Sequence, residues 1–140
     1  MHCILHHAAQ QLQGQPWPQD LEAWLALPGI GRSTAGSILS SAFDRPFAIL
    51  DGNVKRVLAR LTAFEHPPAR HIAHFWSLSE QLLDRQRPRD FNQALMDLGA
   101  TLCTPRQPDC HLCPWQRYCA AYAAGSPERF PVKDQPKPLP

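Results

Sequence analysis

Four cysteines close together near the end of the chain are the residues best suited to do chemistry. Cys103, Cys110, Cys113 and Cys119 follow the spacing C-x6-C-x2-C-x5-C, and four thiolates in so short a segment can surround one soft metal centre. Structural zinc is usually held by two C-x2-C pairs on separate turns, whereas here only Cys110 and Cys113 are paired in this way. The spacing therefore favours an iron–sulfur cluster and leaves zinc open.

A disulfide framework fits these cysteines poorly. The fifth cysteine, Cys3, makes their number odd, and the first residues, MHCILHH, are too polar and too short for a secretory signal. We therefore expect reduced thiols and a cytoplasmic protein. No apolar run approaches the roughly 20 residues of a membrane span, so we also expect no membrane association.

A glycine turn, L-P-G-I-G at 27–31, precedes an expected helix and can bind an anion. Two glycines leave backbone amides uncovered, and the positive end of the following helix dipole favours a phosphate. An ordinary corner between two helices, with glycines that serve packing only, is the alternative. The candidate phosphate-binding residues are Gly29, Ile30, Gly31, Arg32 and Ser33, with Thr34 beside them.

An acidic turn, I-L-D-G-N at 49–53, ends an extended segment and opens another expected helix. Asp51 in this place is most simply a helix N-cap, and from the residues alone that is the safer prediction. The functional alternative is a carboxylate that stabilises a cationic sugar or activates a nucleophile. The two roles compete, because a capping oxygen is committed to a backbone amide.

Helices are expected to position all of these groups, because apolar residues recur at spacings of three and four and no strand pattern stands out. Prolines at 46, 67, 68 and 88 should interrupt them. On the helix after Asp51 the apolar residues Val54, Val57, Leu58 and Leu61 follow helical spacing. We expect apolar faces such as those of Ile38, Leu39, Val57 and Leu61 to be poorly covered, which would make the chain poorly soluble. We expect an all-α chain with helices at 3–13, 19–26, 32–43, 52–63, 70–86 and 89–100.

The expected organisation of the 140 residues has three parts. A helical domain occupies 1–100 and contains the glycine turn within 20–43, and a cysteine-bearing loop follows at 101–124. The proline-rich remainder, 125–140, is expected to be a linker or tail.

Three segments together resemble a known family. LPGIGRSTAGSIL, ILDGNVKRVLARL and FNQALMDLGATLC, followed by the cysteines, are similar to the helix-hairpin-helix DNA glycosylases that carry a [4Fe–4S] cluster, and most closely to the MutY-type adenine DNA glycosylases. The resemblance runs from about Cys3 to the tail and implies a partial helix-hairpin-helix glycosylase fold with an iron–sulfur loop. It implies that the hairpin holds a DNA phosphate, that Asp51 is catalytic and that Asn53 positions the nucleophile or the sugar. It assigns the cluster to Cys103, Cys110, Cys113 and Cys119.

The activity that this resemblance implies is base-excision repair. The family hydrolyses the N-glycosidic bond of adenine mispaired with 8-oxoguanine or guanine, so the expected partner is double-stranded DNA with a mismatched adenine. Arg106 and Arg117 are expected to contact phosphates, with plain surface arginines as the alternative. We further expect a monomer associated with a bacterial nucleoid.

Two positions favour the monofunctional branch over endonuclease III. Endonuclease III carries a lysine nucleophile in its hairpin helix, where this chain has Ser33, and Lys55 is the only lysine outside the tail. The related enzyme also has a D-T-H turn where this chain has Asp51-Gly52-Asn53. A dedicated lyase nucleophile is therefore not expected.

The chain also departs from the family. The family's catalytic glutamate precedes the segment that begins near Cys3, and none of the glutamates here stands in a matching context; they are Glu22, Glu65, Glu80 and Glu128. The domain that inspects 8-oxoguanine would follow the proline-rich segment. A catalytically inactive DNA-binding module with an iron–sulfur cluster is therefore the alternative function, and a structural zinc module is a third.

Overall fold

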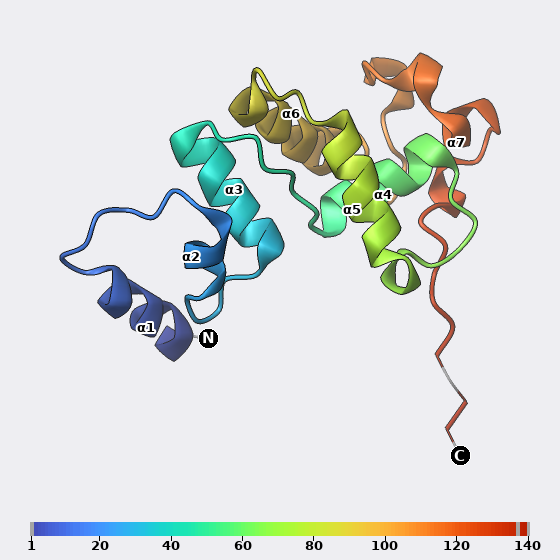
Figure 1. The fold of residues 1–140 in the computed structure, drawn as a ribbon. Helices are drawn as coiled ribbons and strands as arrows, with labels where there is room; N and C mark the ends of the chain where they lie inside the picture. Colours follow the sequence, from blue (N-terminus) through green and yellow to red (C-terminus); the bar gives the residue numbers. More distant parts are fainter. Residues whose placement is uncertain (1, 137, 140) are drawn as a thin grey trace. The chain divides into compact units, whose positions relative to one another are not determined.

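The computed structural model describes residues 2–136 and 138–139, so that Met1, and Lys137 and Pro140 of the predicted tail, lie outside the description (Figure 1). These described residues contain helices and no strand, which confirms the all-α prediction. The chain groups into two compact units. Unit 1 runs up to Ile49 and includes Leu83–Asn92, and unit 2 comprises Leu50–Leu82 and the chain from Gln93 onward. The ranges 1–100, 101–124 and 125–140 do not follow this grouping.

Unit 1 is built on three helices that follow one another along the chain: α1 (His2–Leu12), α2 (Leu21–Leu25) and α3 (Arg32–Phe43). Asp20 begins α2 as its N-cap, because its Oδ1 accepts a hydrogen bond of 2.8 Å from Ala23 N. The helices share one apolar core, and the predicted bounds 32–43 are confirmed for α3. The core residues are Ala8, Trp24, Leu27, Ala35 and Leu39.

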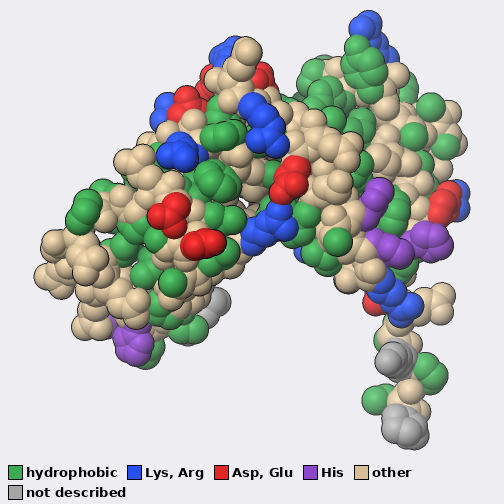
Figure 2. All heavy atoms as spheres, in the orientation of Figure 1, with side chains coloured by type: hydrophobic (Ala, Val, Ile, Leu, Met, Phe, Trp, Pro, Cys, Tyr) green, Lys and Arg blue, Asp and Glu red, His purple; other side chains and the backbone are tan. Residues whose placement is uncertain are grey.

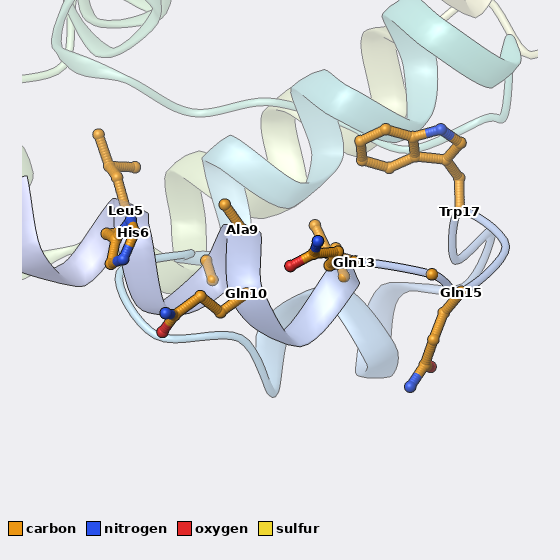
Figure 3. A pocket seen from close by; sticks show the side chains of 10 residues that line it. Leu5, His6, Ala9, Gln10, Gln13, Gln15 and Trp17 are labelled. Atoms are coloured by element: carbon orange, nitrogen blue, oxygen red, sulfur yellow. The ribbon is translucent and has the colours of Figure 1, made fainter.

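The short helix α2 buries one side chain rather than a full face. Trp24 is buried, and its indole Nε1 donates to Pro18 O at 2.6 Å and its ring stacks on Trp17 at 6.2 Å. Leu25 is 41% exposed, because a helix of five residues is too short to turn a second residue inward. An open hollow also runs along α1 from Leu5 to Trp17 (Figure 3).

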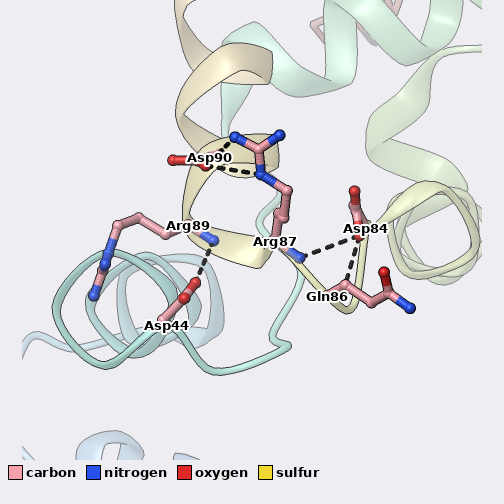
Figure 4. A network of polar contacts seen from close by, with 6 residues as sticks. All are labelled: Asp44, Asp84, Gln86, Arg87, Arg89 and Asp90. Atoms are coloured by element: carbon pink, nitrogen blue, oxygen red, sulfur yellow. Dashed lines mark hydrogen bonds and ion pairs between the residues drawn. The ribbon is translucent and has the colours of Figure 1, made fainter.

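Polar contacts join the end of α3 to the first turn of α6 (Pro88–Thr101), and others form within the segment before α6 (Figure 4). Asp44 ends α3 in the left-handed conformation, and its Oδ1 accepts from Arg89 N at 3.1 Å. Asp84 Oδ1 accepts from the amides of Gln86 and Arg87 at 3.0 and 3.1 Å.

The helix predicted at 70–86 is therefore too long. It ends at Leu82, as α5 (Ile72–Leu82), because Asp84 draws the following amides into a turn. The next helix starts at Pro88 itself, since the first helical position needs no N–H donor.

The extended segment at 44–50, which leads to Asp51, is held from two sides. Gly36 of α3 lies so close to the carbonyl of Ala48 that a Cβ would clash with it. Asn92, which is buried, donates from Nδ2 to Phe47 O at 2.8 Å. These contacts fix the path of the backbone up to the start of the acidic turn.

Unit 2 is organised around α4 (Gly52–Thr62), which packs against α5 and α7 (Ala120–Ala123). Val54, Val57 and Leu58 are buried, Leu61 is half-buried and Arg60 is 2% exposed. The expectation of poorly covered apolar faces is therefore wrong for Val57 and for Leu39, because helices of the chain itself cover them. Short 3₁₀ turns connect the remaining elements, which confirms the loops and turns expected around the cysteines. They are η1 (Pro68–Arg70), η2 (Cys110–Leu112), η3 (Gln116–Tyr118) and η4 (Pro127–Arg129).

The start of the predicted linker is fastened to unit 2. Phe130 is 1% exposed, Arg129 forms an ion pair of 2.7 Å with Glu65, and Asp134 forms one of 2.8 Å with Arg70. The segment expected to be a linker or tail is thus in contact with unit 2 as far as Asp134. Burial of the Phe130 ring stabilises the packed conformation of this segment, even though its composition is rich in proline.

Aromatic and histidine rings close the other end of unit 2, where α4 gives way to η1 and α5. His66, His71 and His74 surround Phe64 with ring centroids 5.8, 5.1 and 5.0 Å away, and Figure 2 shows histidine side chains gathered on this surface.

Across the described part of the chain, no helix combines the length and the apolar character that crossing a membrane demands.

Candidate functional site

The glycine turn lies in unit 1 between α2 and α3. Ile30 N donates to Leu27 O at 3.3 Å, and Gly29 has φ +78°, a conformation that glycine adopts without strain. Gly29, Gly31 and Arg32 are exposed, while Ile30 and Ser33 are half-buried. The side chain of Ile4 lies where a Cβ of Gly29 would be, whereas nothing lies within 4 Å of that position at Gly31. The turn thus leaves the backbone of Gly31 open, directly before a twelve-residue helix.

The N-terminus of α3 differs from those of α2 and α4 in its cap. Asp20 and Asp51 cap their helices through side-chain oxygens, but the N-cap of α3 is Gly31, which has no side chain to do so. A Cβ added at Gly31 would meet nothing within 4 Å. An external anion can therefore approach amides that an aspartate would otherwise cover.

Asp51 is the N-cap of α4, as the structural interpretation of the sequence predicted. Its Oδ1 accepts from Val54 N at 2.8 Å, and its carbonyl accepts from Lys55 N at 2.9 Å. The residue is exposed, and within the described residues only Oδ1 of the carboxylate has a hydrogen-bond partner. One oxygen thus orients the carboxylate, and the other has no hydrogen-bond partner among the described residues.

Arg56, one turn further along α4, links the acidic turn to the first cysteine. Its Nη2 donates to Asn53 Oδ1 at 3.0 Å and to Gly99 O at 2.6 Å, and its Nε donates to Cys103 O at 2.8 Å. Burial lowers the pKa of the Arg56 guanidinium and the neighbouring Arg60 cation lowers it further, while Cys103 and Asp51 oppose both effects.

Because Gly99 has no side chain, the backbone of α6 can approach Asn53 and Arg56 of α4 closely. A Cβ at Gly99 would lie 3.0 Å from Asn53 Cβ, which is closer than ordinary packing allows. The end of α6 can therefore lie against the start of α4, where Arg56 reaches its carbonyl.

The four cysteines line one cavity of unit 2, together with Arg60 and Tyr122. Burial raises the pKa of the Cys110 thiol, and the charges of Cys103, Cys119 and Cys113 raise it further, against Arg60. Thiolates crowded in this way need a cationic centre between them. In the described part of the chain, no three metal-binding side chains converge as the ligands of a single ion do. The four thiols share the lining of one cavity.

Arg60 is the most connected side chain around this cavity. Its guanidinium donates to four acceptors: Phe130 O at 2.9 Å, Thr104 O at 2.6 Å, Pro105 O at 2.9 Å and Cys103 Sγ at 3.4 Å. A buried cation held by carbonyl dipoles beside a thiolate stabilises negative charge at that sulfur.

The two arginines predicted to contact phosphates differ in their surroundings. Arg106 is exposed, and the described residues provide no partner for its guanidinium. Arg117 is exposed too, but its Nη2 donates to Tyr118 Oη at 2.7 Å and its guanidinium lies 4.9 Å from the Tyr118 ring centroid. Arg106 is therefore the better placed of the two for an external anion.

The structure thus gathers the predicted site residues into two groups. Unit 1 holds the hairpin residues Gly29 to Ser33, and unit 2 holds Asp51, Asn53 and the cysteines. Sequence reasoning missed Arg56 and Arg60. The only signal for them was two arginines four residues apart on a helix with an apolar face, a pattern that ordinarily indicates exposed charges.

Two family models match the chain at these places. The helix-hairpin-helix motif matches residues 18–41, and the iron-sulfur binding domain of endonuclease III matches residues 103–119. The first match contains the whole glycine turn, and the second begins and ends on Cys103 and Cys119.

Curated relatives share the intervening sequence as well. The chain is 53% identical to the mouse adenine DNA glycosylase over 69% of its own length and 19% of the relative's. It is 40% identical to the fission-yeast enzyme over 94% of this chain and 31% of that one. The corresponding enzyme of Buchnera aphidicola from Schizaphis graminum is 40% identical, over 88% and 36%. The chain thus spans about a third of these relatives or less.

Solved structures agree on the fold. A thermostable thymine-DNA glycosylase superimposes with a TM-score of 0.76 at 33% identity, over 86% of this chain and 58% of that one. Endonuclease III in a non-covalent complex with DNA gives a TM-score of 0.65 at 22% identity, over 88% and 56%. The chain has the helix-hairpin-helix glycosylase fold, it is related to the adenine DNA glycosylases, and its cofactor is a [4Fe–4S] cluster.

Proposed function

We propose that this chain, a relative of the adenine DNA glycosylases, forms the hairpin- and cluster-bearing part of a monofunctional glycosylase. The substrate is double-stranded DNA in which adenine is mispaired with 8-oxoguanine or guanine. The observation that carries the proposal is the series of Arg56 bonds, which ties the Asp51-Gly52-Asn53 turn to the cysteine-lined cavity. A merely structural turn would not require such a connection.

In this proposal Asp51 acts on the sugar. The adenine leaves the base stack and enters a pocket, because its glycosidic bond is shielded in the duplex. As the bond breaks, the sugar becomes oxocarbenium-like. The second Asp51 oxygen stabilises this cation while Oδ1 keeps its bond to Val54 N. Asn53, held by Arg56, positions the nucleophile or the sugar. The acid that protonates the base is not assigned to any residue of this chain.

The cluster has a structural part in this proposal. Bound by Cys103, Cys110, Cys113 and Cys119, a [4Fe–4S] cluster supplies a rigid anionic core that fixes the loops around it. Arg60 and Arg56 hold the flanking backbone of Thr104, Pro105 and Cys103. The loop between the first two cysteines then presents Arg106 to the DNA backbone.

The hairpin grips a phosphate of the same DNA without reading sequence. Gly31 offers a precise test, because a Cβ there is not hindered. Gly31→Asp supplies α3 with a capping carboxylate and places a negative charge on the anion site, so folding should be unharmed while duplex affinity falls at least tenfold. Gly31→Ser caps the helix without the charge and is the control. Equal affinity of the two variants in filter binding or fluorescence anisotropy would contradict the hairpin assignment.

The catalytic assignment is tested in the full-length protein. Asp51→Asn retains an oxygen for the cap and removes the charge, so adenine release from an adenine:8-oxoguanine duplex should be abolished while the melting temperature stays nearly constant. A residue that served only as a cap would change the melting temperature slightly and the rate hardly at all.

A non-catalytic DNA-binding module with an iron–sulfur cluster is the second candidate, and one observation favours it. The Asp51 carboxylate is engaged as a helix cap, which explains the residue without any chemistry. Residues 1–140 alone are expected to bind duplex DNA and release little or no adenine. Robust release by this segment would contradict that expectation and establish that it carries every group the reaction needs.

The remaining expectations about the protein's setting stay predictions. The relatives come from mouse, fission yeast and Buchnera, so similarity does not favour the expected bacterial source. The expected monomer is checked by sedimentation of the cluster-loaded protein.

A further inference from the structure

A second cavity of unit 2, distinct from the cysteine-lined one, brings together Arg106, which has a role in the proposal above, and Lys133, which has none. It encloses about 560 Å³ and opens beside the first residue of α4. Because Gly52 lines it and follows Asp51 directly, the cavity borders the acidic turn. The residues that define its chemistry are Gly52, Arg56, Arg60, Arg106, Glu128 and Lys133.

The charges around this cavity are strongly unbalanced. Four cations line it against one carboxylate, and that carboxylate is engaged, because Glu128 Oε1 accepts from Gln107 N at 2.6 Å. Arg60 donates to backbone carbonyls and a cysteine sulfur. None of the acceptors of Arg60 or Arg56 is a carboxylate. The single carboxylate of Glu128 cannot neutralise the four positive charges of this cavity.

The two outer cations are unpartnered. Among the described residues, neither the Arg106 guanidinium nor the Lys133 ammonium forms a hydrogen bond or an ion pair, and both residues are exposed. An arginine and a lysine at the mouth of one basic cavity suit a phosphate, since the guanidinium binds two oxygens at once and the ammonium acts as a point charge.

Lys133 is held at this cavity by the fastened tail. On its N-terminal side, the carbonyl of Phe130 accepts from Arg60 Nε at 2.9 Å and the Phe130 ring is buried. On its C-terminal side, Asp134 pairs with Arg70 at 2.8 Å. A lysine within a proline-rich linker would ordinarily be a mobile surface charge, whereas this one is anchored at both sides.

We infer that this cavity binds a phosphodiester of the DNA strand, with Arg106 and Lys133 as its ligands, next to the nucleotide on which Asp51 acts. The inference rests on the proposed function for the identity of the strand. It adds a second phosphate site on unit 2 to the hairpin site on unit 1. It also gives the segment after the cysteines a part in DNA binding.

The test measures how duplex affinity depends on salt. Each phosphate contact contributes about one unit to the slope of log K against log salt concentration. In the cluster-loaded chain, Lys133→Gln should make the slope shallower by about one unit, and Arg106→Gln with Lys133→Gln by about two. Lys133→Arg keeps the charge and should keep the slope. Arg85→Gln removes one exposed charge from unit 1 and should leave the slope unchanged.

The outcomes separate this inference from the proposed function. An unchanged slope in Lys133→Gln, with iron and sulfide content intact, would overturn the inference. A slope that becomes as shallow in Arg85→Gln as in Lys133→Gln would overturn it too. If the protein releases no adenine but Lys133→Gln still makes the slope of log K against log salt concentration shallower by about one unit, the glycosylase assignment fails and the phosphate site stands. If the chain binds no duplex at all, titration with inorganic phosphate, followed by the amide NMR signals of Gly52 and Lys133, decides. Shifts there would mark a free-phosphate site and overturn the DNA assignment.

Discussion

The hairpin of unit 1 and the cysteine region of unit 2 both present a backbone to a charged ligand, but different forces hold them. The hairpin is fixed by neighbours in sequence: Ile30 N bonds to Leu27 O, and Trp24, Leu27 and Ala35 pack beneath it. The cysteine region is fixed by side chains that reach across 43 to 70 residues, from Arg56 and Arg60 to carbonyls of 99, 103–105 and 130. Local order and long-range order should therefore fail in different ways.

The largest effect is expected from Arg60→Met, which keeps an unbranched apolar stem and removes every donor. The carbonyls of Thr104, Pro105 and Phe130 lose their partner in a buried place, at a cost of roughly 3–5 kcal/mol in unfolding free energy. Denaturant unfolding measures this cost, and iron content should fall with it. Arg89→Met is the matched change in unit 1, where the guanidinium is exposed and donates to Ser41 O. A loss as large as that of Arg60→Met would remove the contrast between the units.

Gly36→Ala should have the next largest effect and should act on unit 1. The added methyl group meets the carbonyl of Ala48, so helix and extended segment must separate, at about 1–3 kcal/mol. Gly52→Ala is the control, because a Cβ there meets nothing within 4 Å. Thermal unfolding of both variants measures the difference. Similar melting temperatures would show that the 44–50 segment moves aside at little cost.

These residues also mark how far sequence reasoning goes. The helix at 32–43 was predictable because it depends on local periodicity. The cluster site was predictable because its four cysteines lie close together in the sequence. The burial of Arg60 was not, since its acceptors come from residues 44 to 70 positions away and no local pattern encodes them. The fastened tail had one signal, Phe130 among prolines and charges, which composition alone concealed.

Asp51→Ala should cost about 1 kcal/mol of unfolding free energy, the usual value of a lost N-cap. Asp51→Asn should cost much less, because it keeps an oxygen for Val54 N. Chemical denaturation of the two variants separates the cap from the charge. A large loss in Asp51→Asn would mean that the negative charge itself supports α4.

The smallest effect is expected at the surface of the fastened tail. Arg129 and Glu65 pair at 2.7 Å but are 59% and 57% exposed, so Glu65→Gln should change the unfolding free energy by less than about 1 kcal/mol. The change should shrink further in high salt. A loss above about 1 kcal/mol at low salt that disappears at high salt would show that the ion pair, and not only Phe130, anchors the tail.

The buried ring of Phe130 also limits how far the C-terminal segment can move away from unit 2. Were the chain free from Gly125, the ten residues to Asp134 would let an attached probe sweep an additional radius of about 33–36 Å when extended. With Asp134 paired to Arg70, that radius disappears. A spin label or fluorophore placed at residue 136 then tumbles with unit 2, and distances measured from it report on the cysteine region itself.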